Sequence, residues 1–162
     1  MKYATETDKA EWQAELDAEY NLARNEYGCL KGHEDPNESY PPKRKVFGKD
    51  VRERVKSRFG GRCAYCGCEL GNRFALDHRL PIALFGKKVD VESNLYPACP
   101  QCNHYKGEEL LPTFRQFVKH TFEQLAEKSL TGKMARKFGI LKPVERVTFW
   151  FETFKEQEHE SR

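Results

Sequence analysis

Two CxxC pairs, Cys63-Ala-Tyr-Cys66 and Cys99-Pro-Gln-Cys102, constrain this sequence more than any other feature. Each pair can present two thiolates from one tight turn, and four thiolates satisfy a tetrahedral zinc ion. In a reducing compartment, paired spacings of this kind are typical of metal ligands rather than of disulfides. We therefore expect a structural zinc site made of Cys63, Cys66, Cys99 and Cys102, with redox use of the two pairs as the alternative.

The other candidate ligands give a weaker signal. Cys68 extends the first pair to CxxCxC, so it could replace one zinc ligand, but a spare free thiol is the favoured interpretation. Cys29 and His33 have a plausible ligand spacing but no partner pair. We interpret both as structural or solvated residues.

Length and hydropathy favour a small soluble protein. A chain of 162 residues suits one compact domain with extensions, and 38% hydrophobic residues give a modest core that benefits from a metal staple. No apolar run approaches the roughly 20 residues of a membrane span, and the first residues lack the apolar stretch of a signal peptide. We therefore expect a cytoplasmic protein without a membrane partner.

The charge is distributed unevenly along the chain. Residues 1–40 are acidic, whereas residues 41–62 contain nine Lys and Arg against two Asp and Glu. A basic block of this density is typical of a segment that binds the phosphate backbone of a nucleic acid, although a solvated linker is the alternative. Its position directly before the first cysteine pair favours nucleic-acid binding.

Apolar periodicity predicts two helices before the cysteine-rich centre. Asp8 and Glu11 form a capping-box pattern at the start of an acidic amphipathic helix, which Gly28 ends. Asp50 is expected to cap a short helix that ends at Gly60.

Two more helices and a strand are predicted after the centre. An amphipathic helix is expected to begin near Pro112 or Thr113, and a shorter helix to lie around residues 132–139. The alternating apolar pattern of residues 145–154 predicts a terminal strand. The residues expected on one face of this strand are Val147, Phe149 and Phe151.

The segment between the cysteine pairs contains polar residues that a zinc staple does not need. Asp77 and His78 follow the strand-like residues 74–76, and Asn94 precedes the second pair. Neighbouring side chains on a strand point to opposite faces, so Asp77 and His78 can share one site only if one of them lies at a bend. Alone, such a dipeptide indicates no more than a polar strand end.

Together, the motifs CAYC, LDHRLP, SNL and CPQCNHYKG resemble the HNH endonuclease family in its four-cysteine, zinc-stabilised form. The resemblance covers roughly residues 50–110. It implies an α+β fold with a small ββα-metal core, in which a hairpin with the Asp-His pair packs on a helix that begins around the second CxxC. The expected organisation is an acidic helix and basic loop at 1–48, the nuclease core at 49–110, and a helical extension with the terminal strand at 111–162.

The resemblance also implies roles for individual residues. His78 is expected to act as the general base, because a neutral imidazole can accept a proton at cellular pH. Asp77 and Asn103 are oxygen donors that are expected to hold one catalytic Mg²⁺ or Mn²⁺ ion. Asn94 is expected to pin the hairpin loop by hydrogen bonds, with an ordinary turn asparagine as the alternative. His104, one position after Asn103, is the alternative metal ligand.

The implied function is hydrolysis of DNA phosphodiester bonds by a metal-dependent endonuclease or nickase. Basic residues near the core are expected to contact phosphates, and these are Lys56, Arg58, Arg62, Arg79 and Lys106. The alternative is a catalytically inactive zinc module that binds DNA or a protein partner through the same fold. The flanks resemble those of free-standing HNH proteins of phages and prophages, so a bacterial or phage-infected cell is the expected setting.

Overall fold

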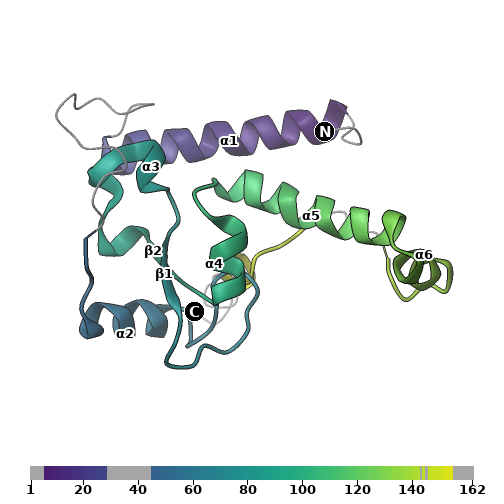
Figure 1. Cartoon of the computed structure of the whole chain (residues 1–162). Coiled ribbons are helices and arrows are strands. Elements are labelled where there is room, and N and C mark those ends of the chain that lie inside the picture. Colours follow the sequence, from purple (N-terminus) through teal and green to yellow (C-terminus); the bar gives the residue numbers. More distant parts are fainter. Residues whose placement is uncertain (1–5, 29–44, 143, 145, 155–162) are drawn as a thin grey trace, which may run out of the picture.

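The computed structural model describes residues 6–28, 45–142, 144 and 146–154 (Figure 1). In chain order the elements are α1 (Glu6–Tyr27), α2 (Lys49–Arg58), β1 (Ala75–His78), α3 (Ile82–Phe85), η1 (Gly86–Val89), η2 (Glu92–Asn94), β2 (Leu95–Ala98), α4 (Pro100–Lys106), α5 (Leu111–Lys128) and α6 (Leu130–Lys137). The two strands form one antiparallel sheet, which Figure 1 shows between α2 and α4. The expected α+β class is confirmed.

The hairpin and α4 form the expected ββα unit. The register places His78, the last residue of β1, opposite Leu95, the first residue of β2. α4 follows β2 directly, because Cys99 is the N-cap of this helix. The Cys99 sulfur accepts a hydrogen bond from the Cys102 N–H at 3.5 Å, which satisfies one of the amides that a helix start leaves unpaired. The second CxxC pair therefore begins the helix, as predicted.

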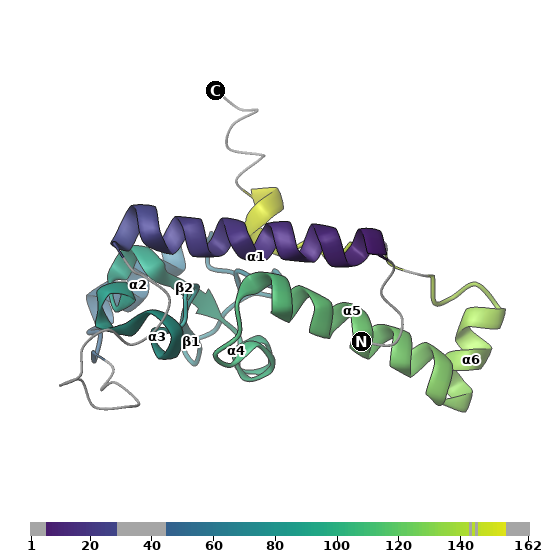
Figure 2. The same ribbon diagram turned by 90° about the horizontal axis from the view of Figure 1, so that it is seen from above.

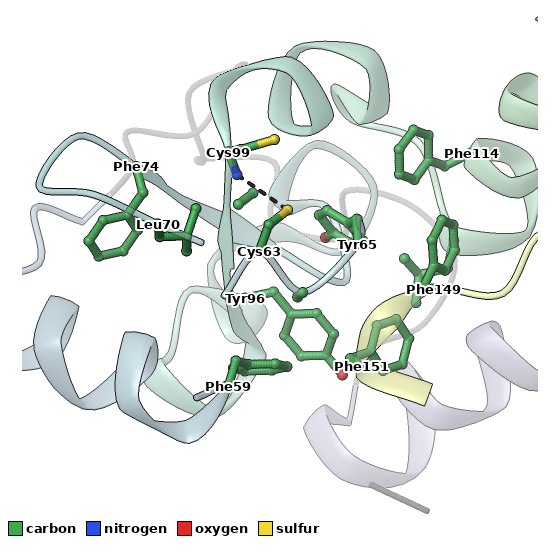
Figure 3. Close-up of a cluster of buried hydrophobic side chains, with 13 residues drawn as sticks. Phe59, Cys63, Tyr65, Leu70, Phe74, Tyr96, Cys99, Phe114, Phe149 and Phe151 are labelled. Carbon is green, nitrogen blue, oxygen red and sulfur yellow. Dashed lines mark hydrogen bonds between the residues drawn. The ribbon is translucent and has the colours of Figure 1, made fainter. Parts of the chain in front are cut away.

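An aromatic cluster around the first CxxC turn forms the larger core of the molecule (Figure 3). The Tyr65 ring, inside this turn, makes edge contacts with Phe114 of α5 and with Phe149, at centroid distances of 5.4 and 5.6 Å. Phe114 and Phe149 stack on each other at 5.2 Å. Aromatic pairs at such separations add to the stabilisation that burial provides. Residues from far along the chain therefore hold the first cysteine turn.

A second, smaller core lies under α1, on the connection between the two strands. Ala23 of α1 is fully buried, and the Tyr20 ring meets the edge of Phe85 at 5.7 Å. Figure 2 shows α1 lying across this region and beside α5. The buried residues that α1 covers are Leu80, Ile82, Phe85, Val89 and Leu110.

The predicted helices are present, with shifted ends. α1 begins at Glu6, two residues before the expected cap at Asp8. The N-cap of α2 is Gly48, so the prediction that Asp50 caps this helix is wrong. Asp50 lies instead in the first turn, where its charge still complements the helix dipole. α5 begins one residue before Pro112, because proline is tolerated in a first turn, and α6 matches the predicted short helix.

The predicted terminal strand is wrong. Residues 146–149 have no regular secondary structure, and residues 150–154 are helical. The N–H groups of Trp150 and Phe151 donate to two carbonyls of the first CxxC turn, both at 2.9 Å. A tight turn is too short to pair with a strand along its length. The segment is therefore attached to the turn by these two hydrogen bonds and continues as a short helix. The alternating apolar pattern reflects the burial of Phe149 and Phe151 in the aromatic cluster.

Within the described part of the chain, no helix combines the length and the apolar character that crossing a membrane requires.

Candidate metal centre and active site

The four cysteines of the two CxxC pairs converge on one point. Their sulfur atoms all lie within 4.8 Å of one another, and the sulfurs of Cys66 and Cys99 are 3.8 Å apart. Zinc–sulfur bonds of about 2.3 Å in a tetrahedron separate the sulfurs by about 3.8 Å, so this spacing fits a zinc ion. Cys63 and Cys99 are buried, Cys102 is partly buried and Cys66 is exposed. The predicted four-cysteine cluster, able to hold a metal such as zinc, is confirmed.

Backbone geometry and hydrogen bonds shape this cluster. The Gly67 N–H closes the first turn by donating to the Cys63 carbonyl at 2.9 Å. Gly67 has a φ of 73°, and a Cβ there would lie 2.4 Å from the Trp150 ring, so a larger residue is strained. The Cys99 N–H donates to the Cys63 sulfur at 3.4 Å (Figure 3). Hydrogen bonds from the Cys102 thiol and from backbone N–H groups lower the pKa of Cys63, which favours the zinc-binding thiolate.

The weaker ligand candidates are not part of this cluster. Cys68 lies outside the group of four sulfurs, and its side chain is exposed. Its carbonyl supports the turn by accepting a hydrogen bond from the Cys63 N–H at 2.8 Å. The interpretation of Cys68 as a spare thiol fits this position. Cys29 and His33 lie outside the described residues.

Asp77 is a buried carboxylate on the side of β1 that meets α4. Its Oδ2 atom accepts a hydrogen bond from the Tyr65 hydroxyl and pairs with the Lys106 ammonium at 2.9 Å. Burial, and then the charge of Asp77, raise the pKa of Tyr65, so the hydroxyl stays protonated and donates. Among the described residues, both contacts of Asp77 use Oδ2. Its second oxygen, Oδ1, is therefore available to a further ligand.

Lys106 is buried with only 1% of its surface exposed. Besides pairing with Asp77, its ammonium donates to the His78 carbonyl at 2.9 Å, so it ties α4 to two consecutive residues of β1. A buried ammonium held by a carboxylate and a carbonyl cannot reach the backbone of a DNA duplex in solvent. This position does not fit the prediction that Lys106 contacts phosphate, and its role in the structure is to join α4 to the hairpin.

His78 is the last residue of β1, where the strand ends, and its side chain has a different partner from Asp77. Its Nε2 atom lies 2.9 Å from Oδ1 of Asp90, and the two side chains are 10% and 7% exposed. Oδ2 of Asp90 accepts a hydrogen bond from the Lys45 N–H at 2.7 Å. The Phe47 ring lies beside the imidazole, with centroids 6.3 Å apart. The segment before α2 and the connection between the strands therefore enclose His78 together.

Sequence reasoning missed Tyr65 and Asp90. Tyr65 stands between two cysteines in CAYC, a motif that indicates metal binding through its cysteines, and Asp90 is a single acidic residue in a loop. A usable signal existed, because a hairpin whose first strand ends at Asp77 and His78 brings both the first cysteine turn and the strand connection close to that pair. A hydroxyl and a carboxylate in those two segments are natural hydrogen-bonding partners for them.

Asn94 closes the connection between the strands. Its side-chain amide donates to the carbonyls of Leu80 and Val89, and its Oδ1 accepts from the Leu80 N–H, all at 2.9 Å. Its own carbonyl accepts from the Arg79 N–H at 2.9 Å. With 2% of its surface exposed, Asn94 uses all these groups inside the protein. These are the contacts expected of a residue that pins the hairpin loop.

α4 orients Asn103 and His104 differently. Asn103 precedes Lys106 by three residues, so both lie on the helix face that meets β1. Asn103 is partly buried, whereas His104 is exposed and its ring contacts Tyr105 at 6.0 Å. The helix therefore turns Asn103 toward the hairpin and His104 away from it.

The other residues predicted to contact phosphate all have intramolecular partners. Arg58 donates to the carbonyls of Glu92 and Leu95, Arg62 to the Gly67 carbonyl and to Glu69, Lys56 to the Gly71 carbonyl, and Arg79 to Glu19. Within the basic block, Arg58 thus links α2 to β2, and Arg62 supports the first cysteine turn. Phosphate contact by these side chains stays a prediction, and residues 41–44 of the block lie outside the described residues.

Comparison with known proteins gives one match. The family model described as HNH endonuclease matches residues 63–109, from the first zinc-site cysteine to just beyond α4. No curated protein and no solved structure matches the chain. The matched segment contains the whole hairpin, α4 and the four cysteines positioned to form a metal site. Residues 63–109 of this chain are therefore a domain of the HNH endonuclease family.

Proposed function

We propose that the chain is a metal-dependent DNA endonuclease or nickase that hydrolyses phosphodiester bonds. The HNH domain implies a nucleic-acid substrate. The observation that carries the proposal is the buried Asp77 carboxylate beside α4, in which Tyr65 and Lys106 fix one oxygen and leave the other available. A module that only binds DNA or protein has no need for a carboxylate oriented in this way.

The donor set between β1 and α4 fits a hard divalent cation. Asp77, through Oδ1, and Asn103, through its amide oxygen, are the residues that would hold Mg²⁺ or Mn²⁺, because these ions prefer oxygen ligands. Such an ion supplies neutralisation of the negative charge on the phosphate and on the departing 3′ oxygen. Tyr65 and Lys106 keep the carboxylate in place through its second oxygen, as groups behind a metal ligand commonly do.

His78 is the proposed general base. Hydrolysis needs a group that takes a proton from the attacking water, and an imidazole suits this task near neutral pH. The ring is mostly buried and is held by Asp90, so it does not sample many rotamers. Asn94 contributes by keeping the connection behind His78 closed, without contact to the substrate.

Cleavage of supercoiled plasmid tests this function. The purified protein with Mg²⁺ or Mn²⁺ should convert the plasmid to nicked or linear product, and His78→Ala should abolish this conversion because the base is lost. Zinc content and circular dichroism of the variant should match the wild type. His120→Ala, a substitution of an exposed histidine on α5, is the matched control and should cleave normally.

The metal control needs care, because EDTA removes zinc from cysteine sites as well as Mg²⁺. Omitting the added divalent ion, with the zinc content measured in the same sample, separates the two sites. A protein that keeps its zinc and binds plasmid but never cuts it would favour the inactive DNA-binding module. Cleavage by His78→Ala at the wild-type rate would remove His78 from the mechanism.

A further inference from the structure

We propose that Asp90 positions His78 and fixes the tautomer of its imidazole. The inference rests on the proposed function, in which His78 is the base. The contact is Nε2 to Oδ1 at 2.9 Å, and both side chains are nearly excluded from solvent. A carboxylate only accepts hydrogen bonds, so a neutral imidazole beside it must carry its N–H on Nε2. The basic lone pair then lies on Nδ1, which is the atom that takes the proton from water.

The Asp90 carboxylate is itself held in one orientation. Its Oδ2 atom accepts the hydrogen bond from the Lys45 N–H at 2.7 Å, while Oδ1 faces His78. The carbonyl of the preceding residue, Val89, accepts a hydrogen bond from Asn94 at 2.9 Å, which fixes the backbone beside Asp90. Each carboxylate oxygen therefore has one defined partner. Orientation of a base by a buried, oriented acceptor is a known way to hold a reactive tautomer.

The Lys45 N–H determines how the side-chain amide of an Asp90→Asn variant would be oriented. A backbone N–H can only donate, so in Asp90→Asn the amide oxygen must face Lys45 and the amide NH₂ must face His78. Nε2 would then have to accept a hydrogen bond, and the ring N–H would move to Nδ1. The variant keeps the shape of the site, but Nδ1 then carries the ring N–H and has no lone pair with which to accept a proton. Asp90→Ala removes the acceptor that holds the N–H on Nε2 but puts no donor in its place, so it does not force the N–H onto Nδ1.

The activities of Asp90→Asn and Asp90→Ala should rank in an order that a merely structural residue would not produce. We expect kcat for plasmid cleavage to fall by about 10²-fold or more in Asp90→Asn, with KM changed little, because base catalysis typically contributes about 10²–10⁴-fold. Asp90→Ala should lose less than Asp90→Asn. If Asp90 only supported the fold, the isosteric amide would be the milder change. Glu92→Gln, in the same connection and paired with Arg54 at 2.7 Å, is the matched control and should keep wild-type kcat.

Nitrogen NMR of protein with ¹⁵N-labelled histidine reads the tautomer directly, without substrate. The signal that disappears in His78→Ala identifies His78 in the folded zinc protein. At a pH where imidazoles are neutral, the wild type should show the Nε2–H tautomer, and Asp90→Asn should show Nδ1–H. A wild-type ring in the Nδ1–H form overturns the proposal even if Asp90→Asn does not fold.

The two hypotheses fail in different ways. A wild-type protein that folds, holds zinc and never cuts DNA defeats the proposed function, while the spectra still decide the tautomer. An active wild type whose Asp90→Asn variant cuts as fast as the wild type, or faster than Asp90→Ala, defeats the role of Asp90 and leaves the nuclease function intact.

Discussion

Asp77 shows how this molecule satisfies a buried carboxylate. Tyr65 reaches it from the first cysteine turn, and Lys106 reaches it from the last turn of α4. A buried carboxylate without such partners costs several kcal/mol, so these two side chains offset the cost of burying Asp77. The contact between the hairpin and α4 is thus electrostatic as well as apolar.

At the same scale, Asn103 and His104 should respond differently to truncation. Asn103→Ala should lower cleavage by about 10²-fold and raise the Mg²⁺ concentration that half-maximal activity requires, because an oxygen donor on the inner face of α4 is lost. His104→Ala should be mild, because that ring is exposed. Cleavage rates across a Mg²⁺ titration measure both effects. An inactive His104→Ala beside an active Asn103→Ala would make His104 the ligand.

At the scale of elements, segments outside the HNH motif complete the domain. α1 covers the connection between the strands, and residues 146–154 attach to the first cysteine turn. Trp150 lies against the backbone of Gly67 and stacks on Phe154, with ring centroids 4.4 Å apart. The first cysteine turn is therefore packed by the aromatic cluster and, at Gly67, by the Trp150 ring.

Gly67→Ala tests the importance of that contact. The new methyl group would clash with the Trp150 ring and sit at a left-handed φ, so unfolding free energy should drop by about 1–3 kcal/mol. Gly71→Ala is the matched control, because a Cβ there meets nothing within 4 Å. Thermal or denaturant unfolding measures the change. The cost of Gly67→Ala should shrink in a Trp150→Ala background, and an equal cost in both backgrounds would argue against the clash.

At the scale of the whole molecule, the cysteine cluster links folding to metal binding. We expect about one tightly held zinc ion per chain, because a domain this small gains much of its stability from the metal. Cys99→Ser should lose structure as well as activity, because a serine hydroxyl can still cap α4 but does not replace a zinc-binding thiolate. Metal analysis and circular dichroism measure the two effects together. A folded protein that contains no zinc would contradict the assignment.

Local patterns in the sequence predicted the zinc cluster and the helices α1, α2, α5 and α6, whereas the hairpin with α4 was expected from the resemblance to the HNH family. The four cysteines and the Asp-His pair occur in short motifs whose geometry is local, and helices follow from apolar periodicity. The buried position of Lys106 depends on Asp77, far back in the chain, so its charge alone suggested a phosphate contact. The segment around Phe149 alternates like a strand, but its partner is a turn, which no periodicity reveals.

The attachment of Trp150 and Phe151 to the first cysteine turn also determines when this turn can complete its packing during protein synthesis. The ribosome releases Cys63 long before it releases the residues that pack against it, so the aromatic cluster stays open through most of translation. Contacts between residues this far apart in the sequence form slowly. The apolar surface that stays exposed until they form is prone to aggregation. Early zinc capture would hold the cysteine turns together during this interval, and the HNH domain gains its full packing only after residue 151 has left the ribosome.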